Sequence, residues 1–323
     1  MILAPTTDNI TTCAVVLRAG GVIGMPTETV YGIAASIQSD EGLQRIFEVK
    51  GRPADNPLIV HVASVDEACE LAADEYHSVL RKIAALFWPG ALTCVVPSAK
   101  TVSPRITAGL STVAVRMPQH NVARALIEEL GCPVAAPSAN RSGRPSPTTA
   151  QHVVHDLGPT IDVLDGGPCT IGLESTVIQL GMDTCTILRP GAVSREQLTQ
   201  ALGYAVDEAT SHDDLRASPG TRYRHYAPTC PVVLCEHEDQ LLRLASSYRD
   251  PIMVLSEHPF QNLPHTAVAS PLSESTIYAE LRRADDLQLA AILVLCDAAV
   301  QRREALMNRL SKAAGSGSHG VSQ

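Results

Sequence analysis

The sequence lacks the short motifs that mark the commonest nucleotide, hydrolase and zinc sites. It contains no GxxxxGK[ST] phosphate loop, no GxSxG nucleophile elbow, and no HExxH or CxxC pair. These absences exclude a Walker-type NTPase, an α/β-hydrolase and the common zinc sites. A nucleotide site in this chain would have to consist of scattered Arg, Lys, Ser and Asn side chains, with any metal ion held mainly by the phosphates.

Aromatic residues are also scarce, at 3% of the chain, so the core must rest on Val, Ile, Leu and Ala. The formal net charge of −9 argues against a protein that holds duplex nucleic acid through its overall field, although it permits a local basic cleft. A run of about 18 apolar residues is absent, and the N-terminus has no basic segment followed by an apolar one. We therefore expect a protein that is neither exported nor membrane-spanning.

The cysteines form no disulfide or metal pattern. There are nine, an odd number, and Cys94, Cys235 and Cys296 fall inside apolar, strand-like runs. Such a distribution is typical of reduced cysteines in a cytoplasmic protein.

A length of 323 residues with 45% hydrophobic content is typical of roughly two globular domains. Strand-like and helix-like segments alternate up to about residue 202, and the last of these helices opens on a capping box from Ser194 to Gln197. The residues that follow are polar and aperiodic, as in a linker. We divide the chain into a first domain, a linker, a second domain and a disordered tail, at residues 1–203, 204–230, 231–314 and 315–323.

The second domain alternates strand and helix patterns again. The apolar runs "PVVLC", "PIMVL" and "AAILVLC" predict strands, and helical patterns follow each of them. This alternation predicts a small, parallel, Rossmann-like sheet. No GxGxxG follows any of these strands, so nothing here indicates a dinucleotide site.

The stretch "KGRPADNP", residues 50–57, connects a predicted helix to a predicted strand. Lys50 lies in the last helical turn, and Gly51 is the expected left-handed residue after it. A helix stop needs neither a guanidinium nor a carboxamide, so Arg52 and Asn56 are left unexplained. Ligand groups tend to lie in such loops between rigid elements.

Further loops of the first domain are equally polar: residues 25–32, 111–118, 135–154, 172–180 and 187–194. Together with residues 50–57 they supply a set of cations: Lys50, Arg52, Arg116, Arg141, Arg144 and Arg189. Arginine suits bidentate recognition of phosphate or carboxylate. If the loops converge, they form an anion-binding cleft.

Several of these polar groups also have a structural interpretation. Ser146 followed by Pro147 predicts a helix N-cap, a role that is compatible with anion binding at the same helix N-terminus. His61 could equally be a satisfied core histidine, and a strand-end arginine is often a salt-bridge partner. For Glu28 and Glu174 the alternatives are surface carboxylates or local caps.

Seven motifs follow one another along the first domain: "PTETVYG", "KGRPADNPLIVHV", "FWPGALT", "STVAVRMP", "APSANRSGRPSPT", "GLESTV" and "ILRPG". In this order they resemble the threonylcarbamoyl-AMP synthase family, the YrdC-like enzymes of tRNA modification. "SPGTRYRHYAP" and "MNRLSKAA" resemble the longer, two-domain form, so the resemblance covers nearly the whole chain. It implies an open, twisted YrdC-like α/β sheet with a large basic concave cavity, plus a smaller Rossmann-like parallel α/β domain at the C-terminus.

The resemblance also implies an activity, the synthesis of L-threonylcarbamoyl-adenylate from L-threonine, bicarbonate and ATP with release of pyrophosphate. The product would feed a separate transferase complex that modifies the adenosine beside the anticodon of certain tRNAs, and a weak contact with tRNA itself stays open. Mg²⁺ would enter with ATP, and no side chain is assigned to a metal. These partners imply a cytoplasmic protein that does not act at a membrane.

The family pattern assigns the threonine site to Thr29, His61, Arg116, Ala136 and Ser175. It assigns the ATP site to Lys50, Arg52, Asn56, Thr112, Ser138, Asn140, Ser146, Arg189, Tyr223 and Tyr226. We expect Lys50 and Arg52 to act catalytically by stabilising charge on the pyrophosphate leaving group. The reaction needs no protein nucleophile, because a carbamate formed on threonine can attack the α-phosphorus itself.

The segment 218–228 is expected to be a lid, in which Arg222, Tyr223 or Tyr226 closes over the nucleotide and keeps water from the mixed anhydride. A passive tether is the alternative. For the whole chain, a non-enzymatic RNA-binding protein is the competing interpretation, against which stand the acidic charge and the scarcity of aromatics. A related carbamoyl-adenylate enzyme of hydrogenase maturation would need cysteine-rich modules that are absent here.

Overall fold

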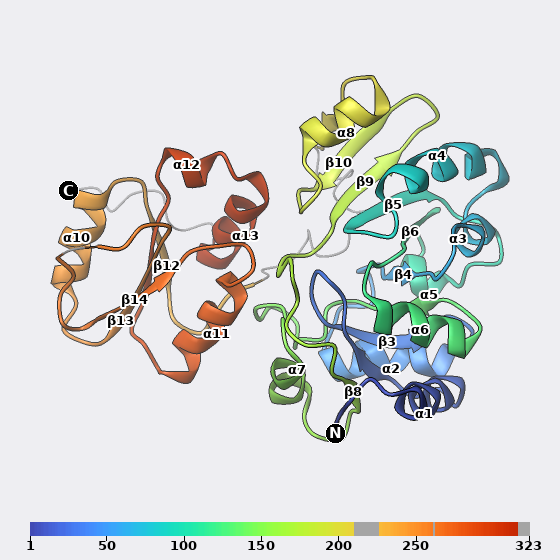
Figure 1. Ribbon diagram of the computed structural model, residues 1–323, viewed down its shortest axis with the longest axis horizontal. Helices are drawn as coiled ribbons and strands as arrows, with labels where there is room; N and C mark the ends of the chain where they lie inside the picture. The colour runs from blue at the N-terminus through green and yellow to red at the C-terminus, as the bar shows by residue number, and fades with distance from the viewer. Residues whose placement is uncertain (210–225, 261, 316–323) are drawn as a thin grey trace. The chain divides into compact units, whose positions relative to one another are not determined.

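The computed structural model describes residues 1–209, 226–260 and 262–315 (Figure 1). The chain forms two compact units. The first unit comprises Met1–Ser142 and Pro147–Arg222, and the second comprises Gly143–Ser146 and Tyr223–Gln323. Four residues that the sequence assigned to the first domain, Gly143–Ser146, therefore belong to the second unit.

The first unit is built on one mixed sheet, which has eleven strands within the described residues, in the order β1-β8-β2-β3-β7-β4-β6-β5-β9-β10-β11. Its strands are β1 (Ile2–Leu3), β2 (Ile23–Met25), β3 (Gly32–Ser36), β4 (Ile59–His61), β5 (Leu92–Pro97), β6 (Thr112–Arg116), β7 (Val134–Ala135), β8 (Val163–Leu164), β9 (Thr176–Leu180), β10 (Cys185–Arg189) and β11 (Asp207–Glu208). Strands β4, β6 and β10 run opposite to β5 and β9. The carboxyl ends of the first three therefore lie at the same edge of the sheet as the starts of the other two.

Helices cover both faces of this sheet around β3, where Ile33 and Ala35 belong to one apolar cluster and Ala34 belongs to another. The second of these clusters is covered by α1 and α6. The helices of the unit are α1 (Thr7–Arg18), α2 (Asp40–Lys50), α3 (Val65–Leu71), the 3-10 helix η1 (Asp74–Tyr76), α4 (His77–Phe87), α5 (Pro104–Thr107), α6 (Asn121–Leu130), α7 (Ala150–Leu157) and α8 (Arg195–Leu202). Further along the sheet, a separate apolar patch consists of Ile59, Val95, Ala114, Val177 and Leu188.

Helix α2 ends where the sequence predicts. The Ser39 hydroxyl accepts a hydrogen bond from the Gly42 amide at 3.1 Å, and Gly51 follows the helix with a left-handed φ of 59°. A glycine adopts this conformation without the steric penalty of a Cβ atom. The "KGRPADNP" stretch is therefore a helix-to-strand connection, as predicted, and Lys50 ends the helix.

Two predictions about local structure are wrong. Helix α7 begins at Ala150 and is capped by Thr149, whose hydroxyl accepts from the His152 amide at 3.3 Å, so Ser146 is not its N-cap. Thr149 offers an equivalent capping oxygen three residues later, and that competing cap determines where the helix starts. The segment 204–230 is also not devoid of regular structure, because β11 lies within it and pairs with β10 in parallel.

The second unit contains a four-stranded sheet in the order β12-β15-β13-β14, and every pair is parallel. Its elements are β12 (Val232–Cys235), α10 (Glu238–Ser247), β13 (Ile252–Ser256), β14 (Ala267–Pro271), α11 (Ile277–Asp286), β15 (Ile292–Leu295), α12 (Ala298–Gln301) and α13 (Glu304–Ala314). The predicted fold class of both units is thus confirmed. Strand β14 escaped prediction because it is a half-exposed edge strand that ends on a proline, a composition that carries little strand signal.

Long-range polar contacts hold the segment Gly143–Ser146 within the second unit. The buried guanidinium of Arg282, on α11, donates to the backbone oxygens of Pro145 and Ser146. Arg144 forms an ion pair with Asp285 at 2.9 Å, and the same carboxylate accepts from Thr229. These contacts explain why a loop of the first domain's sequence folds with the second unit.

The nine cysteines are buried free thiols. Burial raises the pKa of Cys169 and of Cys185 to about 12, which makes both poor nucleophiles. None of the helices in the described ranges has the length and hydropathy of a bilayer span.

Candidate functional site

Lys50 is almost fully buried, and its ammonium contacts the loop that follows β7. It donates to the backbone oxygen of Ser138 and, at 2.6 Å, to that of Asn140. Burial, and then the nearby charge of Arg52, hold the pKa of Lys50 well below its usual value. The structure thus brings together Lys50, Ser138 and Asn140, three of the residues assigned to ATP.

The loop after β7 is ordered by its own side chains and by the chain around β3. The Ser138 hydroxyl donates to the Asn140 side-chain oxygen at 2.6 Å, and the Asn140 amide donates to the Arg141 carbonyl at 2.8 Å. Ser138 also forms an isolated antiparallel bridge with Gly32. Two of the polar loops that the sequence indicated, residues 25–32 and 135–154, therefore lie side by side.

Arg52 turns back onto its own loop. Its guanidinium donates to the carbonyls of Asn56, at 3.3 Å, and Pro57, at 2.8 Å. Asn56 is buried, and its side-chain oxygen has no hydrogen-bond partner among the described residues. Arg52 therefore shapes the loop, while Asn56 carries an acceptor that the rest of the described protein does not satisfy.

Arg116 ends β6 and forms a buried ion pair with Glu28 at 2.6 Å. The same guanidinium donates to the Thr29 hydroxyl at 2.8 Å and to the Gly90 carbonyl at 3.1 Å. Burial alone would raise the pKa of Glu28, but the charge and hydrogen bond of Arg116 outweigh it and lower that pKa. Glu28 is thus neither a surface carboxylate nor a cap, and Arg116 is a salt-bridge partner.

His61 ends β4 and lies opposite Arg116 in the parallel ladder. Burial, and then the charge of Arg116, lower the pKa of His61 to about 3, so its imidazole is neutral at physiological pH. Its Nδ1 atom is buried without a hydrogen-bond partner in the described part of the chain. His61 is therefore a core histidine, as the sequence allowed, with one ring nitrogen left unsatisfied by the described residues.

Ser175 and Arg189 lie at the same edge of the sheet. The Ser175 hydroxyl shares a hydrogen bond of 2.7 Å with Thr93 of β5, and Arg189 donates to the Ser175 carbonyl at 3.0 and 3.2 Å. Ala136 follows β7 and donates its amide to the Ile59 carbonyl of β4 at 3.0 Å. The five residues assigned to threonine thus lie at or near strand ends; Arg116 donates to the Thr29 hydroxyl and pairs with His61 in the ladder of β4 and β6.

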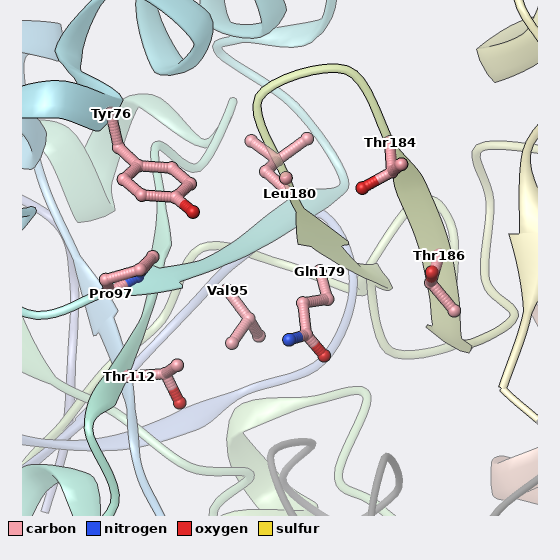
Figure 2. A pocket seen from close by; sticks show the side chains of 9 residues that line it. Tyr76, Val95, Pro97, Thr112, Gln179, Leu180, Thr184 and Thr186 are labelled. Atoms are coloured by element: carbon pink, nitrogen blue, oxygen red, sulfur yellow. The ribbon is translucent and has the colours of Figure 1, made fainter.

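Thr112 begins β6, about 13 Å along the strand from Arg116 at its other end. It lines a cavity of about 250 Å³ together with polar side chains of β9 and β10 and the loop between them, including Gln179, Thr184 and Thr186 (Figure 2). This cavity contains no other residue assigned by the resemblance. Thr112 is therefore separate from the Arg116 cluster.

Other predicted residues do not join these groups. Arg144 and Ser146 belong to the second unit, and Arg141 donates to the Asp156 carbonyl at 2.9 Å. The ring of Tyr226 packs in the second unit, 5.3 Å from Tyr278. The six cations thus do not converge on a single cleft in the described contacts. Tyr223, Arg222 and most of the segment 218–228 lie outside the described residues.

The sequence assigned neither Glu28 nor Thr93 to the site. A signal for Glu28 was present, because it is a carboxylate in a stretch between two apolar strands, where burial requires a cationic partner. No local signal marked Thr93, which occupies one position of the apolar run that forms β5. Its importance follows from strand order, which places β5 between β6 and β9.

Two family profiles together match nearly the whole chain. The profile described as "Telomere recombination" matches residues 15–191, and "Threonylcarbamoyl-AMP synthase, C-terminal domain" matches residues 193–315. The chain is 48% identical over 240 residues to the threonylcarbamoyl-AMP synthase of Bacillus subtilis, an alignment that covers 72% of this chain and 68% of the relative. It is 46% identical over 225 residues to the enzyme of the same name from Pyrococcus abyssi, an alignment that covers 68% of this chain and 66% of that relative.

A solved structure extends this similarity to both units. The crystal structure of P. abyssi Sua5 complexed with L-threonine matches with a TM-score of 0.88 at 36% identity, over 98% of each chain. Sequence profiles, curated relatives and fold agree, and the chain therefore belongs to the threonylcarbamoyl-AMP synthase family, in its two-domain form.

Proposed function

We propose that the chain synthesises L-threonylcarbamoyl-adenylate from L-threonine, bicarbonate and ATP, and releases pyrophosphate. The observation that carries this proposal is the buried cluster of Arg116, Glu28 and Thr29 at one edge of the sheet, in a fold whose relative was crystallised with L-threonine. An arginine with donors directed to one edge suits the α-carboxylate of an amino acid. A non-enzymatic RNA-binding protein finds no support, because the relatives are named as synthases.

The residues around Lys50 form the proposed ATP site. Within the described residues, hydrogen bonds to Ser138 and Asn140 occupy two of the three N–H donors of the Lys50 ammonium, which leaves one for a phosphate oxygen. Lys50 also fixes the loop that carries Ser138 and Asn140, so that their polar groups are preorganised. Thr112, at the far end of β6, is placed for a more distant part of the nucleotide.

The chemistry requires positioning rather than a protein nucleophile. The threonine amine takes up bicarbonate or CO₂ to form a carbamate, whose oxygen attacks the α-phosphorus while the bond to pyrophosphate breaks. Lys50 and Arg52 stabilise the charge that develops on the leaving group, and Mg²⁺ bound with ATP would supply further charge neutralisation there. Asp156 is the one carboxylate whose charge acts on Lys50 among the described residues, and a cluster of acidic or histidine ligands is absent from that part of the chain, so this donor set fits an ion that arrives bound to ATP.

We place the reaction in the cytoplasm, where a separate transferase complex uses the product to modify the adenosine beside the anticodon of certain tRNAs. The nine buried free thiols support a reducing compartment. Direct contact with tRNA is not needed for this role, since the product is a small molecule that diffuses to the transferase.

The decisive experiment is pyrophosphate release by the full chain from ATP, with threonine and bicarbonate supplied together, singly or not at all. We expect release when both are present and none above background when either is withheld. ATP turnover that does not depend on threonine would overturn the proposed function.

A further inference from the structure

Only one of the two carboxylate oxygens of Glu28 has a hydrogen bond of normal geometry in the described structure, although the backbone amides of Glu28 and Gln119 also help to lower the pKa of this carboxyl. Its Oε1 atom accepts the 2.6 Å hydrogen bond from Arg116, whereas Oε2 is buried and has no partner in the described ranges. Glu28 is 5% exposed and Arg116 is 3% exposed, so water has little access to either group. A buried carboxylate oxygen without a donor is costly, and native proteins rarely keep one unless a ligand supplies the missing bond.

The Arg116 side also has unused capacity. A guanidinium carries five N–H donors, and the hydrogen bonds of Arg116 to Glu28, Thr29 and Gly90 occupy three of them among the described residues. The pair therefore presents a vacant acceptor on the anion and vacant donors on the cation. A ligand with one negative and one positive group would satisfy both.

Charge balance points to the same ligand. If only a carboxylate bound to Arg116, two carboxylates would share one guanidinium in a poorly solvated site, and their mutual repulsion would be strong at low dielectric. A ligand that brings its own cation beside Glu28 cancels that repulsion. Free α-amino acids carry their carboxylate and ammonium on one carbon atom, at the spacing needed for adjacent partners.

We propose that Glu28 binds the α-ammonium of the substrate threonine through its second carboxylate oxygen, so that Glu28 and Arg116 together recognise both charges of a free α-amino acid. This inference rests on the proposed function and extends it by a binding residue that sequence reasoning had not assigned. In this arrangement Glu28 binds the substrate directly, and the site selects free amino acids over N-acylated or des-amino compounds.

The titration behaviour of the cluster agrees with this geometry. Arg116 keeps Glu28 ionised, despite the opposing effect of burial, so that the carboxylate can accept from an ammonium. His61, which lies opposite Arg116, has a pKa lowered by burial to about 3 and is neutral. A protonated imidazole at that position would repel the ammonium, and a neutral one does not.

A purely structural role, in which Glu28 only orients Arg116, predicts a different ligand dependence. Loss of the carboxylate would then weaken every ligand that uses Arg116, with or without an amine. The proposal predicts a loss confined to ligands with the ammonium. (R)-3-hydroxybutanoate is threonine without its amine, and it separates the two cases.

The test measures binding of L-threonine and of (R)-3-hydroxybutanoate to the native chain and to Glu28→Gln by titration calorimetry. Glutamine keeps an oxygen that can accept from Arg116 but removes the charge. We expect Glu28→Gln to weaken threonine binding by at least about tenfold, the effect of losing a charge-assisted hydrogen bond, with affinity for (R)-3-hydroxybutanoate unchanged or improved. Glu128→Gln, on the exposed face of α6, is the matched control for loss of one negative charge and should leave both affinities unchanged.

Equal weakening of both ligands by Glu28→Gln would overturn the inference and leave Glu28 a structural partner of Arg116. Should the variant fail to fold, the native chain alone decides, because the inference requires threonine to bind at least about tenfold more tightly than (R)-3-hydroxybutanoate. Equal affinities of the native chain for the two ligands would overturn the inference while the proposed function stands. A native chain that binds no threonine in the presence of ATP and bicarbonate would overturn the proposed function itself.

Discussion

The two units bury arginine side chains in different ways. In the second unit, Arg282 is 3% exposed and Arg309 is 1% exposed. Arg282 donates to two backbone carbonyls. The guanidinium of Arg309 lies 5.5 Å from the ring centroid of Tyr226. In the first unit, Arg116 is equally buried, but its partner Glu28 retains an unpaired oxygen. Burial alone therefore does not distinguish a structural arginine from a binding one.

The difference lies in what surrounds the cation. The carbonyls that accept from Arg282 come from the protein itself and fix the segment Gly143–Ser146. In the first unit, Glu28, Asn56 and His61 each bury a polar atom that nothing in the described chain satisfies. A buried cation beside unsatisfied acceptors indicates a place where a ligand completes the hydrogen-bonding network.

The comparison is tested most severely by Arg116→Ala. This change leaves the Glu28 charge buried without its partner, and we expect the free energy of unfolding to fall by about 3–5 kcal/mol. Threonine binding should weaken by about 2 kcal/mol or more, with ATP binding much less affected. Urea unfolding and titration calorimetry measure the two effects.

The double variant Arg116→Ala with Glu28→Gln is its control. Removal of both charges should recover part of the lost stability without restoring threonine binding, because the stranded carboxylate is gone. If Arg116→Ala folds and loses threonine and ATP affinity equally, Arg116 does not bind the amino-acid carboxylate.

Arg282→Met makes the corresponding change in the second unit. It strands the carbonyls of Pro145 and Ser146, each at a cost of about 1–3 kcal/mol, so the unfolding free energy should fall while the folded protein binds threonine normally. Its neighbour Arg283, half-exposed and paired with Glu280 at 3.3 Å, is the control, and Arg283→Ala should change stability by less than about 1 kcal/mol. Lost threonine affinity with normal stability in Arg282→Met would break the distinction between the two units.

His61 provides a test through pH. Its pKa is lowered from 6.5 to about 3 in the folded protein, so between these values the unfolded chain binds more protons, and the stability due to this depression is lost as pH falls. The stability difference between the native chain and His61→Gln should therefore shift with pH below 6.5, by up to about 1.4 kcal/mol per pH unit, with the native chain losing more on acidification. Unfolding curves of both proteins between pH 7 and pH 5 give the change of this stability difference with pH; below about pH 5 carboxylates also begin to titrate. If the stabilities of the two proteins depended on pH in the same way, His61 would not be buried in the neutral form.

The smallest expected effect concerns helix α7. Thr149→Ala removes the capping hydroxyl and should destabilise the first unit by about 1 kcal/mol, whereas Thr149→Ser keeps a capping oxygen and should restore most of that loss. By contrast, α10 of the second unit begins at Glu238, and the side chain of its N-cap residue, His237, makes no capping hydrogen bond. If the Thr149→Ala and Thr149→Ser variants unfolded at the same temperature, the Thr149 hydroxyl would not be the cap of α7.

Elements with local signals were predictable from the sequence. The start of α2 follows from Ser39, which lies three residues before the amide that it caps, and its end follows from Gly51, which has a positive φ. The capping box of α8 follows from Ser194 and Gln197. Strands β12, β13 and β15 follow from apolar runs that a parallel sheet buries on both faces. The motifs themselves carried the family and its activity, because each is a short stretch whose residues are adjacent in the chain.

Tertiary structure decided which polar residues meet. Glu28 and Arg116 are 88 positions apart, and their ion pair exists because the fold brings the chain between β2 and β3 to the carboxyl end of β6. Contacts between residues distant in sequence also place Arg144 and Ser146 in the second unit: Arg144 pairs with Asp285, and Ser146 accepts from Arg282. A cap or a turn is determined by side chains within a few residues of one another, whereas the partner of a buried charge depends on strand order, which the local sequence does not encode.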